Sequence, residues 1–127
     1  MARFLWICLG GAAGTGARYL LSGWLLRAAG PGFPWGTLAV NVLGSFLLGV
    51  LMQVALTTEL LSPTLRLALT TGVMGGFTTY STFNYETLQY FQQSDWLLGF
   101  ANLATTVVAC LLAGGLGVLA GRLLAGG

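Results

Sequence analysis

The sequence predicts an all-α membrane protein with four transmembrane helices and no separate soluble domain. Of its 127 residues, 56% are hydrophobic and 6% are charged, and the mean hydropathy is +0.83. Soluble domains carry about 25% charged residues, so this chain cannot cover a water-exposed surface. A helix needs about 20 residues to cross the hydrocarbon core of a bilayer, so the length allows four crossings with short connections. We therefore expect a single transmembrane domain over residues 1–127.

The few charged residues limit the classes of function that the chain can perform. All five positive charges are arginines, histidine is absent, and the acids are Glu59, Glu86 and Asp95. Without histidine the chain lacks the commonest proton shuttle and metal ligand. The sequence also contains no nucleotide-binding motif, no catalytic dyad or triad and no cluster of metal-ligating side chains. We therefore expect neither an enzyme nor a protein that binds nucleic acid.

The first predicted helix covers residues 4–26 and contains the small-residue run GGAAGTGARY. Gly10 and Gly14 form a GxxxG pattern, which allows a neighbouring helix to approach closely. Arg18 in the same run is a charge that lies one or two turns from the end of the span. Such a side chain either extends to the lipid headgroups or faces a wet cavity, and the sequence leaves both interpretations open.

The second predicted helix covers residues 35–56 and follows a loop that is rich in glycine and proline, from Gly30 to Pro34. Asn41 lies about a third of the way along this helix, where a side-chain amide costs free energy unless it finds partners. The amide can form interhelical hydrogen bonds, or it can donate its N–H groups to an ion. The segment alone does not decide between these roles.

The third predicted helix, residues 64–91, contains the most unusual stretch of the chain, TTGVMGGFTTYSTFNYE from Thr70 to Glu86. We expect this helix to be broken near Gly75-Gly76. A backbone that unwinds inside a bilayer is tolerated only where protein or a water-filled cavity satisfies its polar groups, so this stretch is expected to line a site or a pathway. The unwound turn from Gly75 to Thr78 exposes carbonyl oxygens, which suit a hard cation such as Na⁺.

Beyond the break, the spacing of the side chains predicts two faces, one with hydroxyl and carboxyl groups and one with aromatic rings. If the helix restarts near Thr79, the first face holds Thr79, Thr82 and Glu86, and the second holds Tyr80, Phe83 and Asn84. The edge of an aromatic ring is positive, so the aromatic face can line the path of a small anion, although ordinary packing is the commoner role of such a stripe. Glu86 is the one acid well within a span, and an intramembrane carboxylate is a candidate functional group.

The fourth predicted helix covers residues 97–119 and makes the number of crossings even, which places both termini on one side of the membrane. Arg3, Arg66 and Arg122 fall on that side, and Arg27 falls on the other. The arginine excess is small, so the positive-inside rule favours cytoplasmic termini only weakly. We expect a multi-pass protein of the cell (inner or plasma) membrane.

Three of the four segments closely resemble one known family. The stretches GGAAGTGARY, PWGTLAVNVLGSFLLG and GVMGGFTTYSTFNYE resemble, in order and in spacing, the motifs of the Fluc (CrcB-like) fluoride channel family. The resemblance implies small four-helix subunits that assemble as an antiparallel, dual-topology homodimer in the lipid bilayer. It also implies two separate fluoride pores along the subunit interface and a structural Na⁺ at the centre of the dimer.

The resemblance assigns roles to individual residues. The ligands of the Na⁺ would be the main-chain carbonyls of Gly75 and Thr78. Arg18 matches the arginine of the vestibule, where Glu86 is also expected. The residues implied for the fluoride pore are Asn41, Thr79, Tyr80, Ser81, Thr82, Phe83, Asn84, Asn102 and Thr106.

The chain also departs from the family pattern at several positions. Tyr80 stands where a phenylalanine is expected, and Asn84 stands where a serine is usual. Cys110 and Gly114 fall where hydroxyl side chains are expected. These departures bear on the conduction rate and on the pathway more than on the fold.

The predicted function is therefore a fluoride-selective channel that exports fluoride passively, and two alternatives share its architecture. A small multidrug-type transporter needs a carboxylate in the centre of its first helix, where this chain has Arg18 and no acid. A non-conducting membrane assembly subunit would use its glycines and hydroxyls only for packing. Such a subunit would tolerate the substitutions Asn41→Ala and Phe83→Ala.

Overall fold

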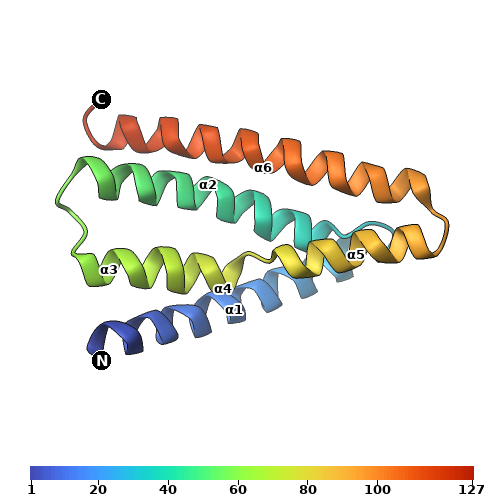
Figure 1. The fold of residues 1–127 in the computed structure, drawn as a ribbon, viewed down its shortest axis with the longest axis horizontal. Coiled ribbons are helices and arrows are strands. Elements are labelled where there is room, and N and C mark those ends of the chain that lie inside the picture. The colour runs from blue at the N-terminus through green and yellow to red at the C-terminus, as the bar shows by residue number, and fades with distance from the viewer.

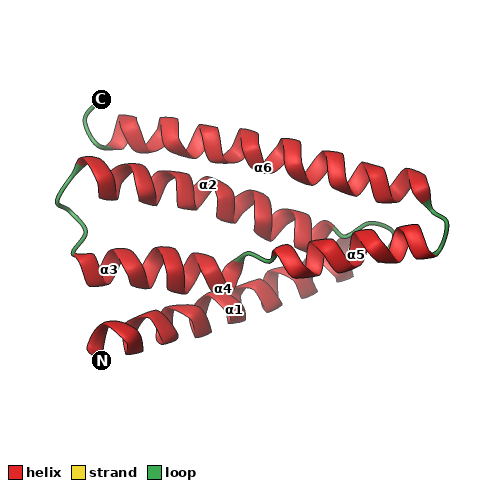
Figure 2. Ribbon diagram, in the orientation of Figure 1, coloured by secondary structure: helices red, strands yellow, loops and turns green.

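The fold is that of a computed structural model, which describes residues 1–127. Every element is helical, as the sequence predicts (Figure 2). The third rod is divided into several segments, one of which is π-helical. The elements in chain order are α1 (Ala2–Ala29), α2 (Trp35–Thr57), α3 (Pro63–Leu67), η1 (Ala68–Met74), α4 (Gly75–Phe77), α5 (Tyr80–Gln92) and α6 (Trp96–Leu124).

These elements form four rods that run in alternating directions (Figure 1). The third rod consists of α3, η1, α4 and α5. Both termini lie at one end of the bundle together with the α2–α3 connection, and the α1–α2 and α5–α6 connections lie at the other end. The first and last rods extend beyond the expected bounds of 4–26 and 97–119 at both ends.

The outer surface of the subunit is strongly apolar. Helices α2 and α6 are long and apolar enough to cross a membrane, with mean hydropathies of 2.0 and 2.2. Only 17 of the 127 residues are buried, and large apolar side chains such as Trp24, Leu97 and Leu111 are exposed. An apolar surface of this extent requires lipid or another protein to cover it.

Glycines bring α1 close to the first half of the third rod. Gly10 and Gly14 lie on one side of this seam, and Gly72 and Gly76 lie on the other. A Cβ added at Gly72 would lie 2.7 Å from the carbonyl oxygen of Ile7, and a Cβ at any of the other three would meet main-chain atoms of the facing rod more closely still. The close approach expected from the GxxxG pattern of α1 is confirmed, and its partner carries the same spacing.

A second glycine seam joins α2 to α6. A Cβ at Gly49 would lie 2.6 Å from the carbonyl oxygen of Gly114, and a Cβ at Gly121 would lie 2.7 Å from the Cβ of Gln53. The bundle is thus built from two closely packed pairs, α1 with the third rod and α2 with α6. Contacts of α1 with α2 and of α5 with α6 join the two pairs.

The break in the third rod lies later than the sequence predicts. Gly75 and Gly76 are helical, and the chain leaves the helix at Thr78 (φ −89°, ψ 158°) and Thr79 (φ −152°, ψ 113°). The predicted break in the third helix and its restart near Thr79 are confirmed, but the unwound residues are Thr78 and Thr79 and not Gly75-Gly76. The reason is that Gly76 serves the close packing against α1, where a side chain would meet the main chain of Gly11. The π-helical segment η1 precedes the break, and π-helical turns are frequent at functional sites.

Candidate functional site

Asn41 of α2 holds the unwound backbone of the third rod through two hydrogen bonds. Its Nδ2 donates to the carbonyl oxygen of Thr79 at 3.0 Å, and its Oδ1 accepts from the N–H of Thr79 at 2.8 Å. The side-chain amide therefore satisfies both backbone groups of a residue that has left the helix, as buried backbone groups require. Asn41 forms the interhelical hydrogen bonds that the sequence allowed, and these use one of the two N–H donors of its amide.

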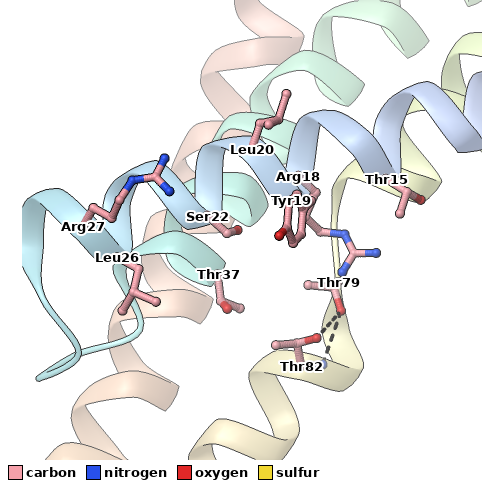
Figure 3. Close-up of a pocket in the computed structure, with 11 residues that line it drawn as sticks. Thr15, Arg18, Tyr19, Leu20, Ser22, Leu26, Arg27, Thr37, Thr79 and Thr82 are labelled. Carbon is pink, nitrogen blue, oxygen red and sulfur yellow. Dashed lines mark hydrogen bonds between the residues drawn. The ribbon is translucent and has the colours of Figure 1, made fainter.

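Arg18 of α1 holds the same break from the other side. Its Nε donates to the carbonyl oxygen of Gly76 at 2.9 Å. This carbonyl belongs to the last helical turn before the break, where carbonyl groups lack helical partners and a positive charge is favoured by the helix dipole. Arg18 also lines a cavity (Figure 3). Of the two interpretations that the sequence left open, the structure supports the one in which Arg18 faces a cavity.

Two other carbonyl groups at the break have lost their helical partners. The N–H of Thr79, which would bind the carbonyl of Gly75 in a continuous helix, binds Asn41 instead. The N–H of Thr82, which would bind the carbonyl of Thr78, donates to Thr79 Oγ1 at 3.3 Å. Gly75 and Thr78 are the residues whose carbonyls the family resemblance implies as Na⁺ ligands. Carbonyl oxygens freed by unwinding are suitable ligands for Na⁺, so these residues fit that ion.

A small group of hydroxyls begins the second half of the third rod. Thr79 is the N-cap of α5, and its Oγ1 donates to Thr82 Oγ1 at 3.0 Å. The Oγ of Ser81 lies 3.5 Å from Thr79 Oγ1. An N-cap threonine fixes the first turn of the helix that it begins, so the hydroxyls of Thr79 and Thr82 are held together at the point where α5 starts.

The cavity beside Arg18 has a volume of about 500 Å³ and lies between α1, α2 and the start of α5 (Figure 3). Three of the predicted residues, Arg18, Thr79 and Thr82, line it. Arg27 and the hydroxyl side chains of Thr15, Tyr19, Ser22 and Thr37 contribute to the same wall. The cavity therefore combines arginine side chains with several hydroxyl donors.

A groove of about 450 Å³ lies along α2, α5 and α6 and is lined by four of the predicted pore residues: Asn41, Tyr80, Phe83 and Thr106. The rings of Tyr80 and Phe83 meet edge to face, with centroids 5.8 Å apart and an interplanar angle of 67°. Phe83 is 6% exposed and Tyr80 is 77% exposed. Thr78, Ser45 and Cys110 also line the groove.

The hydrogen-bonded pair of Asn41 and Thr79 lies between the cavity and the groove. Thr79 lines the cavity, whereas Asn41 lines the groove. Thr78, the other residue of the break, lines the groove as well. An ion that passed from the cavity into the groove would therefore move past this pair and past the break.

Asn102 lies away from both hollows. It is 1% exposed, and its Nδ2 donates to Thr87 Oγ1 at 2.9 Å. Thr106 Oγ1 donates to Asn102 Oδ1 at 3.4 Å, and Thr87 Oγ1 donates to the carbonyl oxygen of Phe83 at 2.8 Å. This buried network joins α5 to α6. The structure thus brings Thr106 to the groove and places Asn102 behind it.

Glu86 lies next to the Arg18 cavity and does not line it. It borders two smaller hollows, of about 170 and 280 Å³, that Phe33 and Pro34 of the α1–α2 connection also line. Thr37 lines both the smaller of these hollows and the Arg18 cavity. The Oε1 atom of Glu86 is buried and has no hydrogen-bond partner.

Two further predicted residues, Ser81 and Asn84, are exposed on the surface of the subunit and line neither the cavity nor the groove. Besides the residues of α1 that line the cavity, three polar residues that the sequence did not single out belong to the site or lie next to it: Thr37, Ser45 and Thr87. Thr37, Asn41 and Ser45 are spaced four residues apart on one face of α2. Their helical spacing relative to Asn41 was therefore the signal that could have identified Thr37 and Ser45. No comparable signal marks Thr87.

The chain matches one protein-family model, described as "CrcB-like protein, Camphor Resistance (CrcB)", over residues 5–118. It is similar over nearly its whole length to proteins named "Fluoride-specific ion channel FluC". The protein of Sorangium cellulosum is 64% identical over 127 residues, which are 99% of this chain and 100% of that protein. The protein of Anaeromyxobacter sp. (strain K) is 58% identical over 126 residues, or 99% and 100% of the two chains. The protein of Geobacter sulfurreducens is 48% identical over 124 residues, or 98% and 100%.

Proposed function

This chain belongs to the CrcB-like protein family, and on that premise we propose that it is a fluoride-selective ion channel of the cell membrane. The resemblance found in its motifs is confirmed by the family match and by the relatives. The family is one of ion channels, which also confirms the prediction that the chain is not an enzyme. The proposed transport is passive export of fluoride.

The observation that carries this proposal is the composition of the groove along α2, α5 and α6. Two aromatic rings, Tyr80 and Phe83, line this groove together with polar side chains that include Asn41, Ser45 and Thr106. Ring edges carry partial positive charge, and hydroxyl and amide groups donate hydrogen bonds. A small, strongly hydrated anion such as fluoride can exchange its water for such groups, whereas a larger anion is excluded by narrowness and by donor geometry.

The cavity beside Arg18 supplies the approach to the groove. A cavity with positive side chains in low-dielectric surroundings raises the local concentration of anions. Its hydroxyls, Thr79 and Thr82 among them, line the route as far as the pair of Asn41 and Thr79. The proposed path therefore runs from this cavity, past the break, into the groove.

The proposed channel is an antiparallel homodimer with dual topology and two pores. One subunit leaves the groove open at its rim, because Tyr80 is 77% exposed and Leu111 is 71% exposed. A second copy against this surface would close the groove and bury its apolar rim, and two equivalent grooves would give two pores. The weak arginine bias between the two ends of the helical bundle supports insertion in both orientations.

We also propose a structural Na⁺ at the dimer centre, held by the main-chain carbonyls of Gly75 and Thr78. Both carbonyls lack their helical partners, and Gly75 is exposed on the surface of the subunit. When bound, the ion would neutralise the carbonyl dipoles that the break leaves uncompensated. The chain's own contribution is to keep the break in one conformation, through Asn41 and Arg18.

The test is efflux from liposomes that hold the purified protein, measured with a fluoride electrode beside a chloride electrode. We expect rapid release of fluoride and no release of chloride above that of protein-free vesicles. Chloride release at a similar rate would contradict selectivity. Absence of fluoride release from correctly folded dimers would contradict the proposed function itself.

A further inference from the structure

We propose that Arg18 is a positioning residue for the cation site, in addition to lining the anion cavity. It would hold the carbonyl groups of α4 and of the break that follows it in the orientation that binds the cation. This inference rests on the proposed function, because it requires a cation at the break. Arg18 would thus connect the two sites, because it lines the anion cavity and also holds the segment that binds the cation.

The first support is the contact itself. Arg18 Nε donates to the carbonyl oxygen of Gly76 at 2.9 Å, across 58 residues of sequence. The carbonyl of Gly75, one of the two proposed cation ligands, belongs to the neighbouring peptide. Both peptides belong to the short helical segment α4, so fixing the peptide after Gly76 limits how far the peptide before it can move without breaking that turn.

The second support is the packing around Gly76. A Cβ at this position would lie 3.0 Å from the backbone nitrogen of Thr15 and would meet the carbonyl of Gly11 more closely. The segment that carries the cation-binding carbonyl is therefore pressed against α1, the helix that carries Arg18. Close packing and the Arg18 hydrogen bond act on the same turn from the same helix.

The third support is the shape of the guanidinium group. An arginine has five N–H donors in a rigid planar fork, and the hydrogen bond to Gly76 uses the donor on Nε. In Figure 3 the guanidinium end of Arg18 points toward Thr79, within the cavity wall. One part of the side chain thus binds the end of α4, while the terminal nitrogens lie beside the start of α5.

A positioning role and a purely electrostatic role of Arg18 predict opposite changes in cation affinity when the side chain is replaced. Arg18 is positively charged, so its charge alone repels a cation at the break, and neutralising it would strengthen cation binding. If Arg18 instead positions the carbonyls, its removal weakens cation binding. The sign of the change therefore separates the two roles.

The experiment measures the midpoint of thermal unfolding of the purified protein against Na⁺ concentration, with N-methylglucamine added to keep the ionic strength constant. The concentration that gives half of the stabilisation reports the apparent cation affinity. The variants are Arg18→Gln, Arg18→Lys and the control Arg27→Gln. Arg27 lies on the same helix and lines the same cavity, but it forms no hydrogen bond to the break.

We expect Arg18→Gln to raise the half-saturating Na⁺ concentration about tenfold, the effect of losing one hydrogen bond to a charged group. Arg18→Lys, which keeps the charge but not the guanidinium fork, should raise it about threefold or more. Arg27→Gln should leave it within about twofold. A residue with a merely structural role would lower the unfolding midpoint at every Na⁺ concentration without moving the half-saturating value.

An unchanged or lowered half-saturating concentration in Arg18→Gln would overturn the inference and leave the channel proposal standing. If Arg18→Gln does not fold, Arg18→Lys decides by the same criterion. Absence of any Na⁺-specific stabilisation in the unmodified protein would overturn both the proposed cation site and this inference. The separate fluoride-efflux measurement would then still decide whether the protein is a channel.

Discussion

Asn41 and Asn102 are both buried asparagines, 9% and 1% exposed, but they bind different kinds of partner. Asn41 binds the backbone N–H and carbonyl of Thr79, in a segment that has left the helix. Asn102 binds only side chains, the hydroxyls of Thr87 and Thr106, between two helices that are continuous there. The difference shows that the state of the nearby backbone decides what a buried amide does.

The two regions also differ in what surrounds them. The Asn41 region lies between the cavity and the groove, so its backbone is close to the proposed ion path. The Asn102 region is closed, and its hydroxyls complete a network inside the subunit. A freed hydroxyl can turn to another acceptor, whereas freed backbone groups in a fixed segment cannot, so we expect the Asn41 region to be the more sensitive to substitution.

The largest expected effect is that of Asn41→Ala. The substitution removes the partners of two backbone groups of Thr79, and each unsatisfied buried group costs about 1–3 kcal/mol. We expect the free energy of unfolding to fall by about 2–4 kcal/mol, and fluoride flux to fall by more than about tenfold because the break loses its fixed conformation. Denaturant unfolding in detergent and liposome efflux measure the two effects.

The matched control for this substitution is Asn84→Ala, since Asn84 is exposed and forms no hydrogen bond. Its stability should stay within about 0.5 kcal/mol of the unmodified protein. If Asn41→Ala retained normal flux, Asn41 would not hold a conducting conformation, and the non-conducting alternative would regain support. The two buried asparagines would then differ in their contribution to stability but not in their contribution to fluoride flux.

Asn102→Ala should have a smaller effect. An interhelical hydrogen bond in a membrane is worth about 0.6–2 kcal/mol. Thr87 Oγ1 keeps its hydrogen bond to the carbonyl oxygen of Phe83, and the hydroxyl of Thr106 can turn to a main-chain carbonyl of its own helix. We expect a loss of stability in that range, and a fluoride flux that falls by less than in Asn41→Ala. A loss of flux as large as that of Asn41→Ala, in a stable protein, would place Asn102 in the pathway that the family resemblance implies.

The all-helical fold was predictable from the sequence, and so were several of the residues that line the cavity and the groove. The charge and hydroxyl pattern singled out Arg18, Thr79 and Thr82, and the structure places all three around one cavity. The aromatic stripe singled out Tyr80 and Phe83, whose rings meet in the groove. These features were visible because polar and aromatic groups at helical spacing are unusual in an otherwise apolar chain.

Two features were not predictable for physical reasons. The position of the break was missed because a glycine serves equally well for unwinding and for close packing, and Gly76 is used for packing. The burial of Asn102 was not predictable because α6 has no distinct apolar face, so hydropathy does not tell which face points inward. Both outcomes depend on contacts with other rods, which sequence spacing within one helix does not contain.

Tyr80→Phe should have the smallest effect. Tyr80 forms no hydrogen bond within the subunit, and its ring meets Phe83 edge to face, a contact that a phenylalanine preserves. Exposed substitutions usually change stability by less than about 0.5 kcal/mol, so we expect unfolding to be unaltered and fluoride flux to change by about twofold or less. A large rise in flux would show that the hydroxyl binds the ion in the groove and slows its release. A large fall would show that the hydroxyl is a required donor, and the groove beside Asn41 would then depend on Tyr80 as much as on the fixed break.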